Sequence, residues 1–192
     1  MMLTDAELFR YLPSRRTDFL ARAIGQVLVD IERLFLNDID EFLMYSQRTR
    51  PDYFSYNSGP VQFRFADGLV QPLAVWGEQL SLVLLPEPLQ ETPYDRLYRL
   101  SELAAAPAAL RSCLNQTCTD IRLWTLQEDF DSTEAKEAAV SYRFEAGQEL
   151  FYVIYLHGEA DSDYLLPAAA VPREQVARCY SIKLGQELDP RS

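Results

Sequence analysis

The chain has 192 residues, of which 48% are hydrophobic, and a formal net charge of −11. This length can bury a substantial core, either in one domain or in two packed halves, whereas the charge argues against binding to nucleic acid or to an anionic membrane surface. The sequence has no run of about 18 apolar residues and no start typical of a secretory signal, so we expect a cytoplasmic protein.

The first half is expected to contain one helix followed by strands. The segment TDFLARAIG (17–25) resembles the end of an amphipathic helix, and its glycine suits the left-handed position beyond a helix end. The apolar spacing at 26–44 also fits a helix. The segment at 116–126, which is similar to 26–36, is richer in β-branched residues, so we predict strands at both. An alternating strand, VQFRF, an Asp-Gly turn and further strands follow. Pro72 within them suits an edge strand or a bulge.

A long loop is expected before the VQFRF strand. Twenty residues separate Asp40 from Val61, against eight between Asp131 and Val140 in the second half. The surplus contains SQRTRPDYFSYNSG, which is rich in arginine and aromatic residues, and long loops in compact domains are often functional. Its expected contact residues are Arg48, Arg50, Tyr53 and Tyr56.

The second half begins after a proline-rich linker at 86–97. We expect a helix that is broken or restarted at Pro107, the strand at 116–126, an alternating strand, VSYRF, and an Ala-Gly turn. The segment LFYVIYL (150–156) is apolar at every position and predicts a central strand that is covered on both faces. A short helix with Pro172 in its first turn and a loose tail at 185–192 end the chain.

Three pairs of segments recur in the same order in the two halves. GEQLSLVLLP matches GEADSDYLLP, VQFRFADG matches VSYRFEAG, and QVLVDIERLFL matches QTCTDIRLWTL. These matches predict an internal repeat. The expected fold is α+β: a tandem repeat of a helix plus a three- to four-stranded antiparallel unit, related by a pseudo-twofold axis. The units are expected at 1–88 and 97–184 within one compact domain.

The sequence offers few residues for catalysis or metal binding. His157 is the only histidine, so the acidic turn HGEADSD is a weak metal candidate, and we expect no metal and no cofactor. Cys113, Cys118 and Cys179 are odd in number and are expected to be free, buried thiols. An enzyme that uses a cysteine or the acidic cluster stays open as an alternative.

Acidic pairs recur after the matched strands, at Asp38 and Asp40 and at Asp129 and Asp131. Aspartate at such points often caps a helix or forms a turn. The alternative is that these carboxylates are presented to arginines or lysines of a basic partner.

The passages SGPVQFRFADG and AVSYRFEAGQELFYVIYLHGEADSDYLL resemble the strand and turn patterns of small cytoplasmic immunity proteins of bacterial toxin systems. The resemblance implies an α+β fold, no enzymatic activity and an acidic surface that occludes a basic surface of a toxin domain. With the arginine and tyrosine loop, the implied partner contacts are Asp129, Asp131, Glu134, Glu159, Asp161 and Asp163. A secretion chaperone or adaptor, which is also small and acidic, is the alternative binding function.

Overall fold

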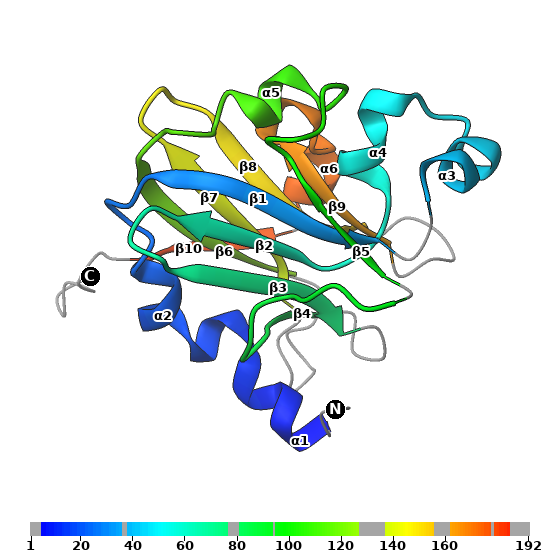
Figure 1. The fold of residues 1–192 in the computed structure, drawn as a ribbon. Helices are drawn as coiled ribbons and strands as arrows, with labels where there is room; N and C mark the ends of the chain where they lie inside the picture. The colour runs from blue at the N-terminus through cyan, green and yellow to red at the C-terminus, as the bar shows by residue number, and fades with distance from the viewer. Residues whose placement is uncertain are drawn as a thin grey trace, which may run out of the picture.

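A computed structural model describes residues 5–35, 38–76, 81–93, 95–126, 137–155, 162–177 and 179–184. Two five-stranded antiparallel sheets lie face to face, with short helices around them (Figure 1). The predicted α+β class and the two antiparallel sheets are confirmed. Each sheet has one strand more than the three or four that we expected.

The first sheet has the order β4-β3-β2-β1-β5 and the second the order β9-β8-β7-β6-β10, so strands in the same positions follow the same order along the chain. The strands are β1 Leu28–Phe35, β2 Val61–Phe65, β3 Val70–Trp76, β4 Ser81–Leu84, β5 Arg96–Arg99, β6 Cys118–Leu126, β7 Glu137–Phe144, β8 Glu149–Tyr155, β9 Ser162–Pro167 and β10 Cys179–Lys183. The α-helices are α1 Asp5–Leu8, α2 Thr17–Ala21, α3 Ile39–Ser46, α4 Tyr53–Tyr56, α5 Ala108–Arg111 and α6 Arg173–Ala177. The 3-10 turns are η1 Phe9–Tyr11, η2 Pro13–Arg15, η3 Arg50–Asp52 and η6 Ala168–Ala170.

The first two strands of each sheet pair in a comparable register. Ile31 pairs with Phe63 in the first sheet and Ile121 with Tyr142 in the second, and each pairing has a register shift just after its first residue. Two glycines with φ of 87° and 85°, Gly68 and Gly147, turn the chain into the next strand. Glycine adopts this left-handed conformation without steric cost. The predicted strands at 26–36 and 116–126 and both turns are therefore confirmed.

The two sheets meet through reciprocal backbone hydrogen bonds just before β1 and β6. Gly25 N donates to Cys118 O at 2.7 Å, and Asn115 N donates to Leu28 O at the same distance. Both donors have the positive φ that was predicted for the residue after a helix end. These two bonds fix the position of the start of β1 relative to the start of β6.

One apolar core fills the space between the sheets. The alternate residues of β2 and β7 that were expected to point inward are all at most 3% exposed, namely Val61, Phe63, Phe65, Val140, Tyr142 and Phe144. The rings of Phe63 and Tyr142 stack across the interface at a centroid distance of 4.2 Å. Full burial of side chains of this size stabilises the fold by about 1.5–3 kcal/mol each.

Strand β8 is buried on both faces, as its uniformly apolar sequence predicted. Tyr152 and Ile154 join the main core. Phe151 and Val153 pack on the outer side in a second cluster, which α6 and η6 cover with Val176 and Val171.

Three expectations about the first half need correction. Pro72 lies in β3 between two paired strands, not on an edge. The carbonyl of Pro72 accepts a hydrogen bond from Leu85 N, just beyond the last residue of β4. Because the N–H and C=O of one residue face the same neighbouring strand, the N–H that Pro72 lacks would also point past the end of β4. The expected loop after β1 folds into α3, η3 and α4. The linker contains β5, which pairs with β1 and extends the first sheet beyond the boundary expected at residue 88.

Candidate functional site

The segment 38–57, called the insertion here, is built from local helix signals. Asp38 accepts a hydrogen bond from Glu41 N at 2.9 Å and caps the start of α3. Thr49 and Asp52 then form a capping box for η3. Gln47, with φ of 54°, ends α3. The capping interpretation of Asp38 is thus confirmed.

Helix α3 presents large apolar side chains outward. Phe42 is buried, and its ring lies 5.4 Å from that of Tyr53. Met44 is 73% exposed and Tyr45 is 76% exposed. The exposed Asp40 precedes Met44 by one helical turn. Figure 1 shows α3 projecting beyond the sheets.

Arg33 of β1 binds the backbone of the insertion from the interior of the protein. Its side chain has no exposed surface. It donates to the carbonyls of Phe54 and Ser55 at 2.8 and 3.2 Å and to that of Gly59 at 2.9 Å. A buried guanidinium needs such partners, because burial of an unpaired charge is costly.

Asp163 of β9 completes this buried hub. Its Oδ2 accepts from Arg33 at 2.8 Å and from the hydroxyl of Tyr152 at 2.7 Å, and its Oδ1 accepts from Gly59 N at 2.9 Å. Burial, with the Asp163 charge beside it, raises the pKa of Tyr152 well above its usual value, so its hydroxyl stays protonated as a donor. The hub fastens the end of the insertion to the start of β9.

Gly59 has no substitute at its position. Its φ is 149°, and a Cβ would lie 1.9 Å from the carbonyl oxygen of Leu34. The backbone therefore approaches β1 more closely than any side chain allows.

Aromatic contacts continue from the hub to the surface. Arg48 stacks over the ring of Tyr56 at 3.5 Å, a cation–π contact. The Tyr56 ring lies 5.2 Å from that of Tyr164 in β9. Residues more than 100 positions apart thus form one surface where α4 meets β9.

The structure places the predicted contact residues in different environments. Arg48 and Arg50 are exposed, and Arg50 forms an ion pair with Asp40 at 3.3 Å. Tyr53 and Asp163 are buried, so neither is available to a partner, and their role is to hold the insertion. The predicted contacts outside the described residues are Asp129, Asp131, Glu134, Glu159 and Asp161, and His157 is outside them as well.

Met44 and Tyr45 were missed by the sequence reasoning. The signal was present, since Asp38 starts a helix whose inward positions are Ile39, Phe42 and Leu43. This spacing leaves the two residues after them on the outer side.

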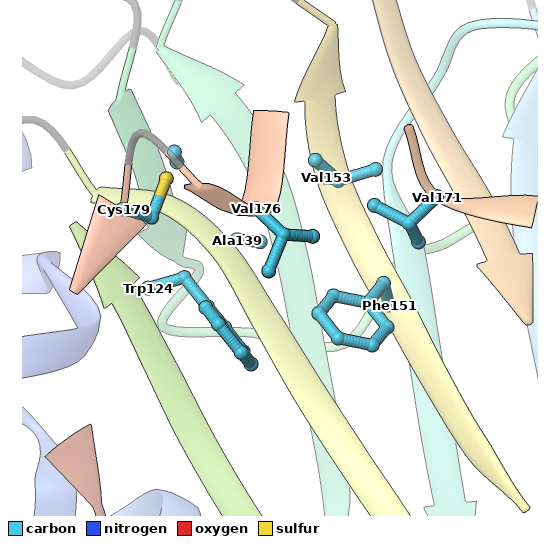
Figure 2. A pocket seen from close by; sticks show the side chains of 8 residues that line it. Trp124, Ala139, Phe151, Val153, Val171, Val176 and Cys179 are labelled. Atoms are coloured by element: carbon cyan, nitrogen blue, oxygen red, sulfur yellow. The ribbon is translucent and has the colours of Figure 1, made fainter. Parts of the chain in front are cut away.

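Two of the three thiols, those of Cys113 and Cys118, are buried. Burial raises the pKa of Cys113 to about 11 and that of Cys118 to about 12, so both stay protonated at neutral pH. Cys179 is half-buried and lines an apolar cavity with Trp124 and Phe151 (Figure 2). The cavity offers about 10 Å³, roughly the room for one water. Among the described residues, no group of three or more histidine, cysteine or acidic side chains could hold a metal.

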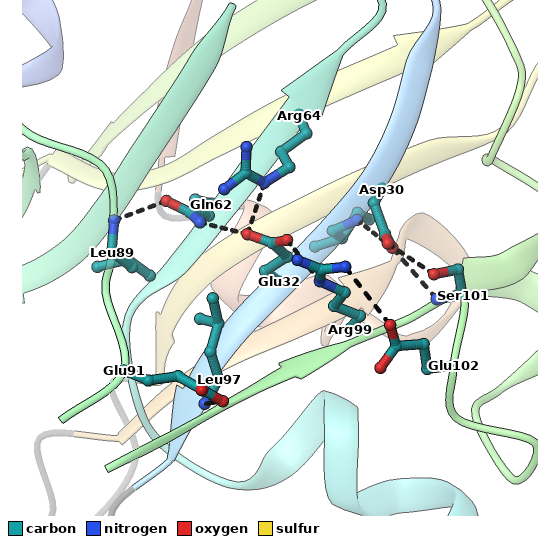
Figure 3. A network of polar contacts seen from close by, with 11 residues as sticks. Asp30, Glu32, Gln62, Arg64, Leu89, Glu91, Leu97, Arg99, Ser101 and Glu102 are labelled. Carbon is teal, nitrogen blue, oxygen red and sulfur yellow. Dashed lines mark hydrogen bonds and ion pairs between the residues drawn. The ribbon is translucent and has the colours of Figure 1, made fainter. Parts of the chain in front are cut away.

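A polar network covers the outer face of the first sheet (Figure 3). Glu32 is buried there between Arg64, whose Nε lies 2.7 Å from Oε2, and Arg99, whose Nε lies 3.0 Å from Oε1 without hydrogen-bond geometry. Gln62 donates to Glu32 and accepts from Leu89 N. The two arginines thus balance the charge of the buried Glu32, and the network fastens the linker across the sheet.

Comparisons with known proteins place this chain in no family. A scan of family models and searches of curated proteins and of solved structures found no match. In the described part of the chain, no helix combines the length and apolar character that a membrane crossing requires.

Proposed function

We propose that the chain is a non-enzymatic, acidic protein-binding module that contacts a basic protein partner through the insertion. The observation that carries this proposal is the pair of exposed side chains Met44 and Tyr45 on α3. Helix α3 packs through Phe42 on Tyr53 of α4, and the buried Arg33 binds the carbonyls of α4. Large exposed apolar residues on a preorganised support are typical of the centres of protein interfaces. Binding then costs little ordering of the chain.

Charge supports a basic partner. The net charge of −11 gives the molecule a negative field that speeds association with a positive surface. On α3 itself, the exposed Asp38, Asp40 and Glu41 precede the two apolar residues and give the contact an acidic border.

Within this class the proposed partner is a bacterial toxin domain, which the protein neutralises by occluding a basic surface. The sequence resemblance to immunity proteins favours this partner.

We further propose that the fold is a duplication of one unit. The equal strand order, the comparable registers and the reciprocal bonds of Gly25 and Asn115 support it. The insertion is then an addition to the first unit alone, and such additions to a repeated scaffold are common places for function.

The test is co-expression with the toxin-like domain encoded next to this gene. We expect the wild-type protein to restore growth and the M44S/Y45S variant to fail, because the apolar centre of the contact is lost. Val29→Ser is the matched control, since Val29 is exposed at the far end of β1. Equal rescue by all three proteins, or a neighbouring gene without such a domain, contradicts the proposal.

A further inference from the structure

Strand β10 is an edge strand with exposed apolar side chains. It pairs with β6 only, and Tyr180 and Ile182 are 40% and 49% exposed. Their cross-strand neighbours, Thr125 and Leu123, are buried. An apolar edge of this kind is a ready template for pairing with another strand.

The outward backbone groups of β10 can be identified from its pairing. Leu184 N donates to Ile121 O of β6. Because the groups of successive residues alternate in direction, those of Ile182 and Tyr180 also face β6, and those of Ser181 and Lys183 face outward. Within the described part of the chain, no hydrogen bond satisfies the outward N–H of Ser181.

The corresponding edge in the first sheet is closed. Leu100 N donates to Ile31 O of β1, so the N–H of Leu97 in β5 faces outward. Glu91 of the linker accepts it at 3.1 Å (Figure 3). Tyr98, on the inner side of β5, packs against Tyr53 of the insertion at a ring distance of 5.5 Å. Of these two edges, β10 is the one without such a cover among the described residues.

We propose that β10 pairs in an antiparallel manner with β10 of a second copy, about a twofold axis at Ser181. This register matches outward backbone groups with outward backbone groups, at Ser181 with Ser181 and at Cys179 with Lys183. It also places Tyr180 opposite Ile182 in both halves of the pairing, and aromatic and β-branched residues form favourable cross-strand pairs. A twofold axis midway between two residues would set outward groups opposite inward ones and form no bonds. An axis at Tyr180 or Ile182 would match fewer outward residues within β10 than the axis at Ser181 does.

Charge favours a second copy at this edge. In a chain of net charge −11, β10 contains no carboxylate, and its only charged residue, Lys183, lies 3.4 Å from Asp120 of its own sheet. Two β10 strands can therefore approach without bringing acidic side chains of these strands together. The result is a continuous ten-stranded sheet across two copies.

Disulfide trapping tests the register. In a C179S background, Ser181→Cys places two thiols opposite each other at a Cα separation of about 5.5 Å, which suits a disulfide. The matched control is Leu97→Cys at the corresponding position of the closed edge β5. We expect S181C to form covalent dimers under mild oxidation at least about tenfold faster than L97C. Equal rates overturn the proposal.

Sedimentation of the full chain over about a hundredfold range of concentration is the second measurement, because dimerisation follows mass action. Ser181→Pro removes the outward N–H while leaving the β6 bonds in place, and proline is tolerated at such edge positions. We expect the wild type to dimerise and S181P to weaken association at least about tenfold, with an unchanged circular dichroism spectrum. A wild-type protein that stays monomeric throughout, or that binds other extended peptides at β10 instead, overturns the proposal.

Discussion

The two sheets share one strand order but differ at the places where each lies against the other. Arg33 of β1 reaches Asp163 of β9, and these two polar residues are buried in the interface. The pairing registers place Leu123 of β6 and Leu82 of β4 at the corresponding positions of the other half, and both lie in the apolar core. The comparison teaches that the ion pair is not required to pack the sheets. It is required to satisfy the carbonyls of the insertion.

The same contrast extends to the edges. The outer strand of the first sheet is covered by the insertion and by the linker. In the second sheet, no described residue covers β10 in this way. In the proposed account, one half binds a partner through added chain and the other half binds a second copy through a bare edge. The predictions below change one side of this comparison at a time.

Breaking the buried ion pair is expected to have the largest effect. Arg33→Leu leaves Asp163 buried without its cation, and we expect a loss of about 3–5 kcal/mol in the free energy of unfolding. R33L/D163L, which copies the two leucines of the other half, should lose less than the sum of the single variants. Urea denaturation of the four proteins measures this. Additive losses would show that the two residues act independently.

Gly59→Ala is expected to have the next largest effect. A Cβ there collides with the Leu34 carbonyl and disturbs the bonds of Gly59 to the hub, so we expect a loss of about 2–4 kcal/mol. Gly68→Ala is the control, because Gly68 has a positive φ but open space around it. That variant should lose only about 1 kcal/mol. Equal losses in thermal unfolding would contradict the role of close approach.

Glu137 lies in the second sheet, where η2 covers it. This residue predicts that the stability of the protein depends on pH. Burial raises its pKa above 4.5, although hydrogen bonds from Ser14 N at 3.0 and 3.2 Å oppose the shift. The folded state therefore holds this proton more tightly than the unfolded state. Its stabilising contribution is full below pH 4.5 and is lost as the pH rises through the folded value.

We therefore expect the stability of the wild type relative to Glu137→Gln to increase as the pH falls from 7 to 5. Asp52→Asn is the control. The Thr49 hydrogen bond lowers the pKa of Asp52 below 3.8, so its contribution stays constant over this pH range. A flat difference for E137Q in denaturation at both pH values would refute the assignment.

Opening the closed edge is expected to have the smallest effect. Glu91→Ala removes the acceptor of Leu97 N–H at an exposed site, and we expect a loss of about 0.5 kcal/mol. If the linker protects this edge, self-association measured by sedimentation should increase slightly. Unchanged association would mean that Arg96 and Arg99 are sufficient to protect β5.

Local patterns in the sequence predicted the strands that form the core and the turns between them. The alternation of Val61, Phe63 and Phe65 determines which face is buried, and Gly68 determines the turn. Strands β5 and β10 were not predicted, because short edge strands with exposed side chains lack an apolar pattern.

The hub was beyond prediction for a different reason. Arg33 and Asp163 are 130 positions apart, and nothing in either local sequence indicates that they form a buried pair. Asp163 was therefore predicted to be a partner contact, since an acidic residue in an acidic segment is usually exposed. The insertion was predicted as a contact surface and Asp38 as a cap or turn residue, but Thr49 and Asp52, which form the second cap, were interpreted as loop residues.

The most direct test of the central claim is calorimetric titration of the toxin-like domain encoded next to this gene with the wild type, M44S/Y45S and a V29S control. The account predicts that loss of the two α3 side chains weakens binding by at least about 2 kcal/mol, or roughly thirtyfold, while V29S, a control without a substitution in β10, binds like the wild type. Equal affinity of all three proteins would contradict the claim that the insertion is the binding surface.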